Sequence, residues 1–293
     1  MTQTPSVVVL AGGSNSRFWP LRAKSLFPIA GRTLLEHHID GLIAAGCRRF
    51  VVVANPETRE DVAAAVAGLA ADVSVAVQTE ARGMGDALLV AAAHEPKLAR
   101  APLMVTQAHD VVEPSLYQRF VEAARSNDAS GLLAGQRVRS YFPGGYLALD
   151  GARVTGLVEK PPPGSEPSDV VSLVVHLHRR PDLLLERIRD AYAEPNPADD
   201  HYERAVASLL DGHRYDLVAY EGGWQAVKYP WHVLGVMDLA LRDLAPSEKL
   251  PEGVSGPVVL EEGVRILPGA RVVGPAWVGA GALIGTTCWC AAR

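Results

Sequence analysis

The chain opens with a short apolar run that is followed by two glycines and two basic side chains. Gly12 and Gly13 carry no β-carbon, so backbone N–H groups there can approach a phosphate or a base closely. Arg17 and Lys24 follow and place two positive charges beside that turn. A triphosphate needs such neutralisation before an anionic nucleophile attacks it. The segment predicts a phosphate-binding loop with both cations in catalytic roles; solvated surface charges are the alternative interpretation.

Further polar residues stand at the ends of two later apolar runs. Asp110 ends one of them, where a carboxylate beside a phosphate loop suits a hard cation such as Mg²⁺. Capping of the following helix is the alternative role for Asp110. Gln78 ends the other run, and its amide offers a donor and an acceptor to the edge of a base. The alternative is that Gln78 is an ordinary polar residue at the end of a strand. Gly83 lets the backbone pass close to a nucleotide.

These residues lie in a half-chain that alternates short apolar runs with amphipathic stretches. The expected strands are Val7–Leu10, Phe50–Ala54, Val73–Val77 and Leu103–Thr106. The expected helices are Thr33–Ala45, Arg59–Leu69, Gly85–Ala93 and Pro114–Ser126. This alternation predicts a Rossmann-like, doubly wound α/β domain with a mixed sheet, in which ligands lie outside the carboxyl ends of strands.

The second half is expected to hold more strands than helices. The expected strands are Gly131–Ala134, Tyr146–Ala148, Val154–Val158, Val171–Leu177 and Asp216–Tyr220, and the expected helices are His201–Leu210 and Trp231–Asp243. Residues 1–245 are therefore predicted to form one domain and residues 246–293 a second segment.

That final segment has a six-residue period. Its repeating positions are Leu260, Ile266, Val272, Val278, Ile284 and Cys290. A hexad with one inward aliphatic side chain predicts a short left-handed β-helix, with independent hairpins as the alternative. About two coils are too few to be stable alone. Their open edges, and the exposure expected for Trp277 or Trp289, predict a homo-oligomer formed through the tail.

The segment LAGGSNSRFWPLRAKSLFPIAGRTLL, residues 10–35, resembles the signature of the sugar-1-phosphate nucleotidyltransferase family. The resemblance implies that Leu10, Ala11 and the two glycines contact base and ribose, that Arg17 contacts the β and γ phosphates, and that Lys24 contacts the α-phosphate. Asn15 and Ser16 replace the glycine and threonine of the signature.

Later segments extend the resemblance over nearly the whole chain. It implies that Gln78 reads the base and that Asp110 holds Mg²⁺. In GLVEKP, Glu159 would accept hydrogen bonds from sugar hydroxyls and Lys160 would pair with the sugar phosphate. Gly145 in the GGY segment matches a glycine that lies near the sugar.

Departures from the family pattern open a competing interpretation. The segment GGWQAVKYPWHVL resembles the family pattern WxDVGxPWDLL. Ala226 stands where the family has its second metal-binding aspartate, and His232 stands where the pattern has a later aspartate. Ser172 begins SLV where an NxG motif is expected. A non-catalytic protein that senses nucleotides or sugar phosphates would show such losses. If the protein is an enzyme, Glu221 or His232 could take the place of the missing aspartate. Such an enzyme is expected to need a higher concentration of Mg²⁺ or Mn²⁺.

The predicted activity is the joining of a sugar 1-phosphate to a nucleoside triphosphate, with release of pyrophosphate.

Composition excludes several other classes of protein. Hydrophobic residues make up 48% of the chain, which excludes a disordered chain. The net charge of −5 gives no reason to expect nucleic acid as a partner. No run approaches the ~18 apolar residues of a membrane span. The chain has only three cysteines, which favours a cytoplasmic setting over a disulfide-bonded secreted one. Their number and spacing do not suit a zinc site. Acyl transfer by the tail is disfavoured because no histidine follows Gly235.

Overall fold

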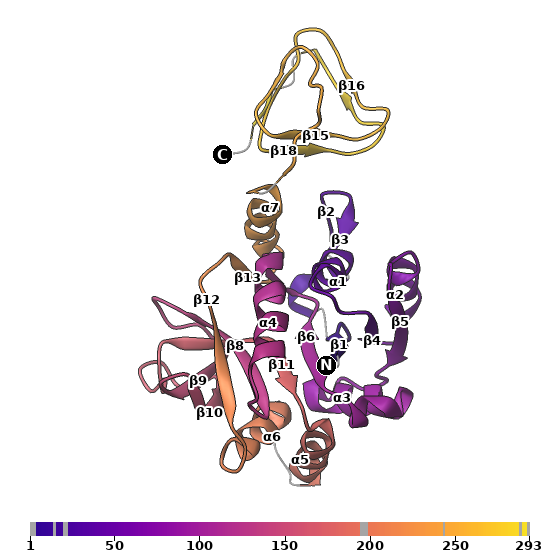
Figure 1. The fold of residues 1–293 in the computed structure, drawn as a ribbon. Coiled ribbons are helices and arrows are strands. Elements are labelled where there is room, and N and C mark those ends of the chain that lie inside the picture. The colour runs from indigo at the N-terminus through magenta and orange to yellow at the C-terminus, as the bar shows by residue number, and fades with distance from the viewer. Residues whose placement is uncertain are drawn as a thin grey trace.

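A mixed β-sheet forms the centre of the computed structural model, which describes residues 4–13, 16–19, 23–193, 199–242, 244–286 and 289–291 (Figure 1). Within these ranges the nine strands follow the order β5 (Asp72–Val77), β4 (Arg49–Ala54), β1 (Ser6–Leu10), β6 (Leu103–Gln107), β11 (Val170–His178), β8 (Gly131–Arg137), β12 (Tyr215–Tyr220), β10 (Arg153–Glu159) and β9 (Gly145–Asp150). Strand β1 runs parallel to β4 and β6, whereas β11 runs antiparallel to β6 and β8. The predicted mixed α/β fold is confirmed.

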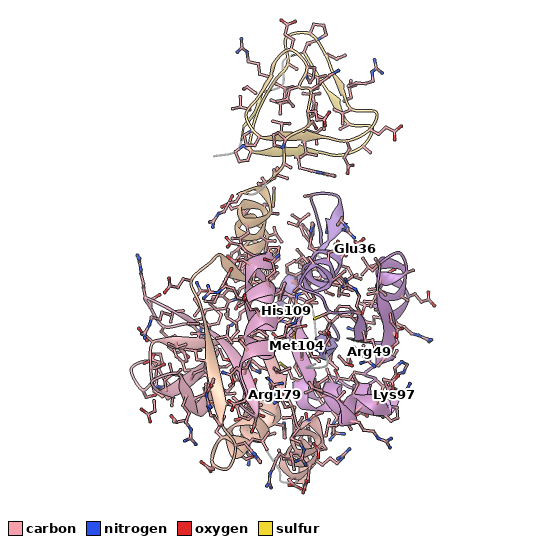
Figure 2. All side chains as sticks on the ribbon, viewed as in Figure 1. Glu36, Arg49, Lys97, Met104, His109 and Arg179 are labelled. Carbon is pink, nitrogen blue, oxygen red and sulfur yellow. The ribbon has the colours of Figure 1, made fainter. Side chains whose placement is uncertain are left out.

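Helices cover both faces of this sheet. One face packs on α1 (Leu34–Ala44), α2 (Arg59–Val66) and α4 (Pro114–Ser126), and the other on α3 (Gly83–His94), α5 (Pro181–Ala193) and α6 (His201–Leu210). Val7 and Val9 point to the first set of helices, and Val8 to the second, which explains why the strand is apolar throughout. In Figure 2, Met104 lies in this interior, whereas Lys97 lies at the molecular edge. No helix in the described ranges combines the length and apolar composition that crossing a bilayer requires.

The predicted elements are present, with ends that differ by a few residues. The helices at 114–126 and 201–210 begin and end as predicted. Helix α2 ends at Val66 rather than Leu69, because the chain tightens into a turn in which the Leu69 N–H donates to the Val66 carbonyl. The prediction overlooked α5, although Leu184 and Ile188 repeat at helical spacing after a proline start.

Two short ribbons outside the sheet were also not predicted. Strand β7 (Asp110–Val112) pairs antiparallel with β13 (Trp224–Ala226), which leads to α7 (His232–Arg242). Strands β2 (Pro28–Ile29) and β3 (Arg32–Thr33) form a hairpin ahead of α1. Each ribbon is too short to produce a strand-like pattern of alternating residues, so pairing between distant segments defines it.

The C-terminal segment winds as a triangular coil, drawn in yellow in Figure 1. Its strands form three parallel sheets: β14 (Val254–Ser255), β17 (Arg271–Val273) and β20 (Trp289–Ala291); β15 (Val258–Leu260) and β18 (Ala276–Val278); and β16 (Arg265–Ile266) and β19 (Leu283–Ile284). Paired residues such as Val254 and Val272 are eighteen positions apart, which is three six-residue units. Val258, Ala270 and Val272 fill the interior of the coil.

The coil contacts the β2–β3 hairpin through Trp277. Gly31 in the β2–β3 turn has a φ of 77°, and a β-carbon added there would come within 2.6 Å of the Trp277 ring. Of the two tryptophans of which one was expected to be exposed, Trp277 is half-buried, because its ring packs against a turn with no side chain. The side chain of Trp289 lies outside the described residues.

Substitution of Gly31 tests this contact. Gly31→Ala adds a β-carbon against Trp277, which we expect to cost about 1 to 3 kcal/mol beyond the strain of positive φ. Gly151→Ala is the matched control, because Gly151 has a φ of 61° and no atom near the added β-carbon. Thermal unfolding should show a Tm several degrees lower for Gly31→Ala than for Gly151→Ala. Equal Tm values would show that the coil does not rest on this turn.

Candidate active site

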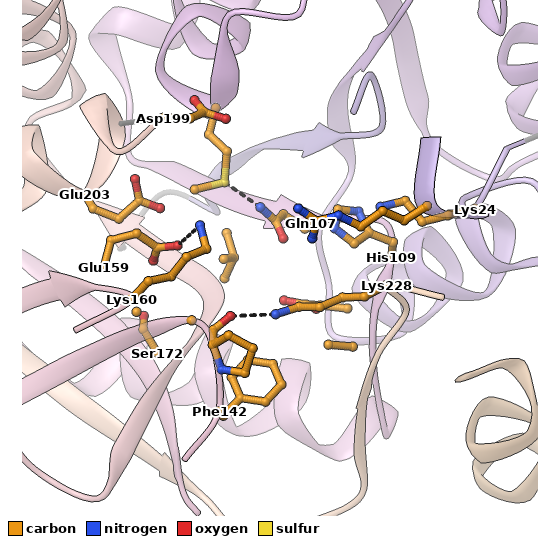
Figure 3. Close-up of a pocket in the computed structure, with 18 of the residues that line it drawn as sticks. Lys24, Gln107, His109, Phe142, Glu159, Lys160, Ser172, Asp199, Glu203 and Lys228 are labelled. Atoms are coloured by element: carbon orange, nitrogen blue, oxygen red, sulfur yellow. Dashed lines mark hydrogen bonds and ion pairs between the residues drawn. The ribbon is translucent and has the colours of Figure 1, made fainter. Parts of the chain in front are cut away.

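A central cavity of about 360 Å³ lies at the carboxyl end of β6 and extends to the ends of β9 and β10 (Figure 3). Six of the residues predicted from the sequence line it: Arg17, Lys24, Asp110, Gly145, Glu159 and Lys160. The other predicted residues do not line it: Leu10, Ala11, Gly12, Gly13, Gln78 and Gly83. The cavity therefore joins the predicted phosphate and sugar residues and leaves the predicted base residues outside.

Asp110 and two lysines form one end of the cavity. Asp110 begins β7, so its carboxylate belongs to a ribbon and does not cap α4, which begins after Glu113. Burial raises the pKa of Asp110 to about 6, while Lys228 and Lys24 oppose that rise. Burial likewise lowers the pKa of both lysines, and Asp110 opposes that change. The charges at this end are thus partly desolvated and electrostatically coupled.

Buried apolar side chains hold the cations of this end in place. Phe18 and Val227 are fully buried in one small cluster. Arg17 precedes Phe18 in a short 3-10 helix (Ser16–Phe18), and Lys228 follows Val227. The backbone that carries each cationic side chain is therefore anchored by a buried neighbour, although the Arg17 side chain itself is exposed. His109 beside Asp110 is kept neutral, because burial lowers its pKa to about 3.

Glu159 and Lys160 form the opposite end. The Lys160 ammonium lies 2.6 Å from a Glu159 carboxylate oxygen. Lys160 has a φ of 45°, an uncommon conformation for a residue with a side chain and one that concentrates at functional sites. A β-carbon on Gly145 would lie 3.2 Å from the Glu159 carboxylate, so the glycine leaves room for that acid. The dipeptide signature thus corresponds to one compact charged pair.

Two acids that the sequence did not single out line the same end. Glu203 on α6 is 9% exposed, and burial together with the neighbouring Glu159 raises its pKa to about 8. Asp199 lies nearby and covers Gly83, where an added β-carbon would overlap its carboxylate. Neither acid belongs to a local motif, and Glu203 reaches the cavity because α6 packs across β10.

The predicted base residues have structural partners of their own. Gln78 is 5% exposed, and its amide donates to the Gly83 carbonyl at 3.1 Å and to Asp86 Oδ2 at 2.8 Å. Its polar group is therefore engaged inside the protein, as the alternative interpretation of a polar strand end has it. Gly12 fits against the backbone of Ala54 in β4, where an added β-carbon would lie 3.2 Å away.

Ala226 stands directly opposite Asp110 in the β7–β13 ribbon. An acid at position 226 would therefore lie beside Asp110, since opposed residues have β-carbons about 5 Å apart. With alanine there, Asp110 has two lysines as its charged neighbours. Among the described residues no group of three His, Cys, Asp or Glu side chains is arranged to hold a metal ion. The residues present do not fit a preformed divalent-metal site.

Neither proposed substitute for the missing acid serves the site. Glu221 does not line the cavity. His232 accepts a hydrogen bond from the Lys228 backbone N–H at 3.0 Å and fixes the start of α7. The idea that either residue compensates for Ala226 is therefore wrong in this structure. Lys228 also lines the cavity, and sequence reasoning missed it, although it stands at the glycine of the WxDVGxPWDLL pattern.

A family model described as Nucleotidyl transferase matches residues 6–227. The chain belongs to the nucleotidyl transferase family. Among curated proteins, the "Bifunctional protein GlmU" of Burkholderia orbicola is 31% identical over 276 residues, which cover 91% of this chain and 56% of the relative. GlmU of Xanthobacter autotrophicus is 33% identical over 187 residues, or 53% of this chain and 41% of that protein. This family member spans about half the length of the curated relatives it matches.

Solved structures resemble the nucleotidyl transferase fold of this chain. A UDP-glucose pyrophosphorylase complexed with UDP-glucose has a TM-score of 0.66 at 18% identity, covering 80% of this chain and 97% of the other. A UDP-glucose pyrophosphorylase from Acinetobacter baumanii also has a TM-score of 0.66, at 17% identity, covering 82% and 95%. At these identities the likeness shows the shared fold.

The pH dependence of stability tests the environment of Asp110. Its pKa is raised in the folded state, so folding favours the protonated acid, and stability should fall as pH rises from about 4 to about 6. Asp110→Asn removes this loss and should raise the Tm above pH 7, by an amount corresponding to about 2 to 3 kcal/mol. Asp150→Asn, at an exposed position of β9, is the control and should leave the pH profile unchanged. An Asp110→Asn profile parallel to wild type would contradict the burial of this charge.

Proposed function

We propose that this protein joins a sugar 1-phosphate to a nucleoside triphosphate, giving a nucleotide-activated sugar and pyrophosphate. The observation that carries the proposal is a single cavity with the cationic group around Asp110 at one end and the Glu159–Lys160 pair at the other. Such a cavity suits two phosphorylated substrates that meet between its ends. Family membership and a fold shared with a UDP-glucose pyrophosphorylase support the same reaction class.

Positioning and charge neutralisation would supply the catalysis. Lys160 would hold the sugar phosphate while Glu159 accepts hydrogen bonds from sugar hydroxyls. An oxygen of that phosphate attacks the α-phosphorus in line, the bond from that phosphorus to the bridging oxygen breaks, and pyrophosphate leaves with the electron pair. Arg17 would neutralise the β and γ phosphates and Lys24 the α-phosphate. No general base is required, because the nucleophile is already anionic.

The nucleotide would extend from the phosphates toward the ends of β1 and β5. The residues proposed to contact it are Leu10, Ala11, Gly12, Gly13, Gln78 and Gly83. Their strands run parallel to β6, so their carboxyl ends meet at the same edge of the sheet as Asp110. Donation from the Gln78 amide to a base would require one of its N–H groups to leave the Gly83 carbonyl or Asp86.

Mg²⁺ or Mn²⁺, which the resemblance implies, is proposed to arrive as part of the metal–triphosphate substrate. Asp110 is the residue proposed to contact it, because Mg²⁺ often takes one or two carboxylates and completes its shell with phosphates and water. A protein that senses nucleotides or sugar phosphates without catalysis is the second candidate, and Ala226 is the observation that favours it.

Loss of Lys24 tests the reaction. Lys24→Met should lower pyrophosphate release by about a hundredfold, because one preorganised charge on the phosphates is removed. Lys97→Met, at an exposed position at the molecular edge (Figure 2), should leave the rate unchanged. Release is measured for a panel of triphosphates paired with sugar 1-phosphates. If no pair gives pyrophosphate but ligands still raise the Tm of the wild type, the sensing function replaces the catalytic one.

The C-terminal coil is proposed to be a left-handed hexapeptide β-helix comprising residues 246–293, after a nucleotidyltransferase domain of residues 1–245. Its eighteen-residue strand spacing supports this assignment. We further propose that the protein is cytoplasmic, consistent with the buried free thiol of Cys47. It would self-associate through the coil, whose last strands have an unpaired edge in the described residues.

Removal of the coil tests this association. Deletion of the residues after Gly256 should lower the mass measured by light scattering to that of a monomer, because the open edge is lost. Far-ultraviolet circular dichroism checks that the first domain stays folded. A full-length protein that is already a monomer, or a truncated one with unchanged subunit number, would refute association through the coil.

A further inference from the structure

Lys228 lines the cavity and reaches across it. Its ammonium donates to the Pro143 carbonyl at 2.6 Å and lies 4.1 Å from the centre of the Phe142 ring. Figure 3 shows this side chain crossing between the Lys24 and Glu159 sides of the cavity. One carbonyl and one aromatic face hold the ammonium in position, and neither is an anion that would neutralise it.

The charge around Lys228 is arranged for an anion. Burial lowers the pKa of Lys228, Asp110 and Glu159 oppose that change, and Lys160 and Arg17 add to it, so four charged groups act on the ammonium. Lys24 acts on the same carboxylate of Asp110. Among the residues that the structure describes, the end of the cavity near Asp110 therefore holds three cations and one acid: Arg17, Lys24 and Lys228 with Asp110. A phosphate is attracted to such a set, whereas a free divalent cation is repelled by it.

The β7–β13 ribbon explains why a lysine is tolerated there. Ala226 lies opposite Asp110 and contributes no charge, and Lys228 follows two residues later from the same segment. Relative to the WxDVGxPWDLL pattern, this segment has lost an acid and gained a cation. Both changes make the space beside Asp110 more positive, so they act in the same direction.

We propose that Lys228 is a direct phosphate ligand, and that the cationic end can bind a polyphosphate even when no divalent metal accompanies it. Lys228 would supply, from the protein, positive charge at the place where a second acid would otherwise favour a metal ion. The cationic end near Asp110 is also the phosphate site of the proposed function. The inference rests on that function only for the identity of the biological ligand.

Binding of inorganic pyrophosphate in EDTA tests the inference. Isothermal titration calorimetry should show binding to the wild-type protein, and Lys228→Met should weaken it by about tenfold or more, the loss expected for a charge-assisted hydrogen bond. Lys228→Arg should retain most of the affinity, because it keeps the charge. Lys97→Met should bind as the wild type does. Thermal unfolding of each variant checks that the fold is intact.

Binding of Mn²⁺ gives a second readout that is independent of turnover. Electron paramagnetic resonance should detect no bound Mn²⁺ in wild type without phosphate, whereas the double variant Ala226→Asp, Lys228→Gly should acquire a site. Wild-type pyrophosphate binding that vanishes in EDTA and returns with Mg²⁺ would overturn the inference. So would a Lys228→Met protein that is folded and binds pyrophosphate as tightly as wild type.

These outcomes separate the inference from the proposed function. Pyrophosphate binding in EDTA without turnover on any substrate pair would support the role of Lys228 and reject the enzyme. Turnover with Mg²⁺ but no binding in EDTA would support the enzyme and reject the metal-independent site.

Discussion

The antiparallel pairing of β7 with β13 is the constraint on which the cavity depends. It brings Asp110, which begins β7 just after the central strand β6, against a segment that follows β12 far later in the chain. The same pairing sets which residue faces the carboxylate, since register fixes the opposed side chains. Because the uncharged Ala226 takes that place, the charged groups that act on Asp110 are Lys228 and Lys24. A three-residue ribbon thus determines the charge of the site.

The groups in the cavity are placed at some cost to stability. Burial raises the pKa of Asp110 and of Glu203, and lowers the pKa of Lys24 and Lys228, so each charged form is disfavoured relative to water. Large apolar clusters on both faces of the sheet offset this loss. Such partly desolvated charges interact strongly with an incoming phosphate because little water screens them.

Sequence reasoning predicted the sheet, most helices and half of the candidate site. Local patterns sufficed for continuously apolar strands such as β1 and for the Glu159–Lys160 pair, which is formed by adjacent residues. They did not suffice for Glu203, whose place depends on how α6 packs over β10. For Gln78 the position was predicted but the contact was not. Its place at a strand end follows from the sequence, whereas its hydrogen bond to Asp86 depends on the side-chain rotamer in the folded protein.

Lys228 shows how a departure from a pattern carries information that the pattern does not. Taken alone, Ala226 indicates only the loss of a metal ligand and favours a protein without catalysis. Taken with Lys228, it indicates a site whose positive charge belongs to the protein and is held by Pro143, Phe142 and the buried Val227. A fixed ammonium and a bound metal ion both stabilise phosphate charge, and they differ in that the ammonium needs no acidic cage. If Lys228 binds phosphate as proposed, the missing acid is compatible with a phosphate site in which the lysine supplies part of the positive charge.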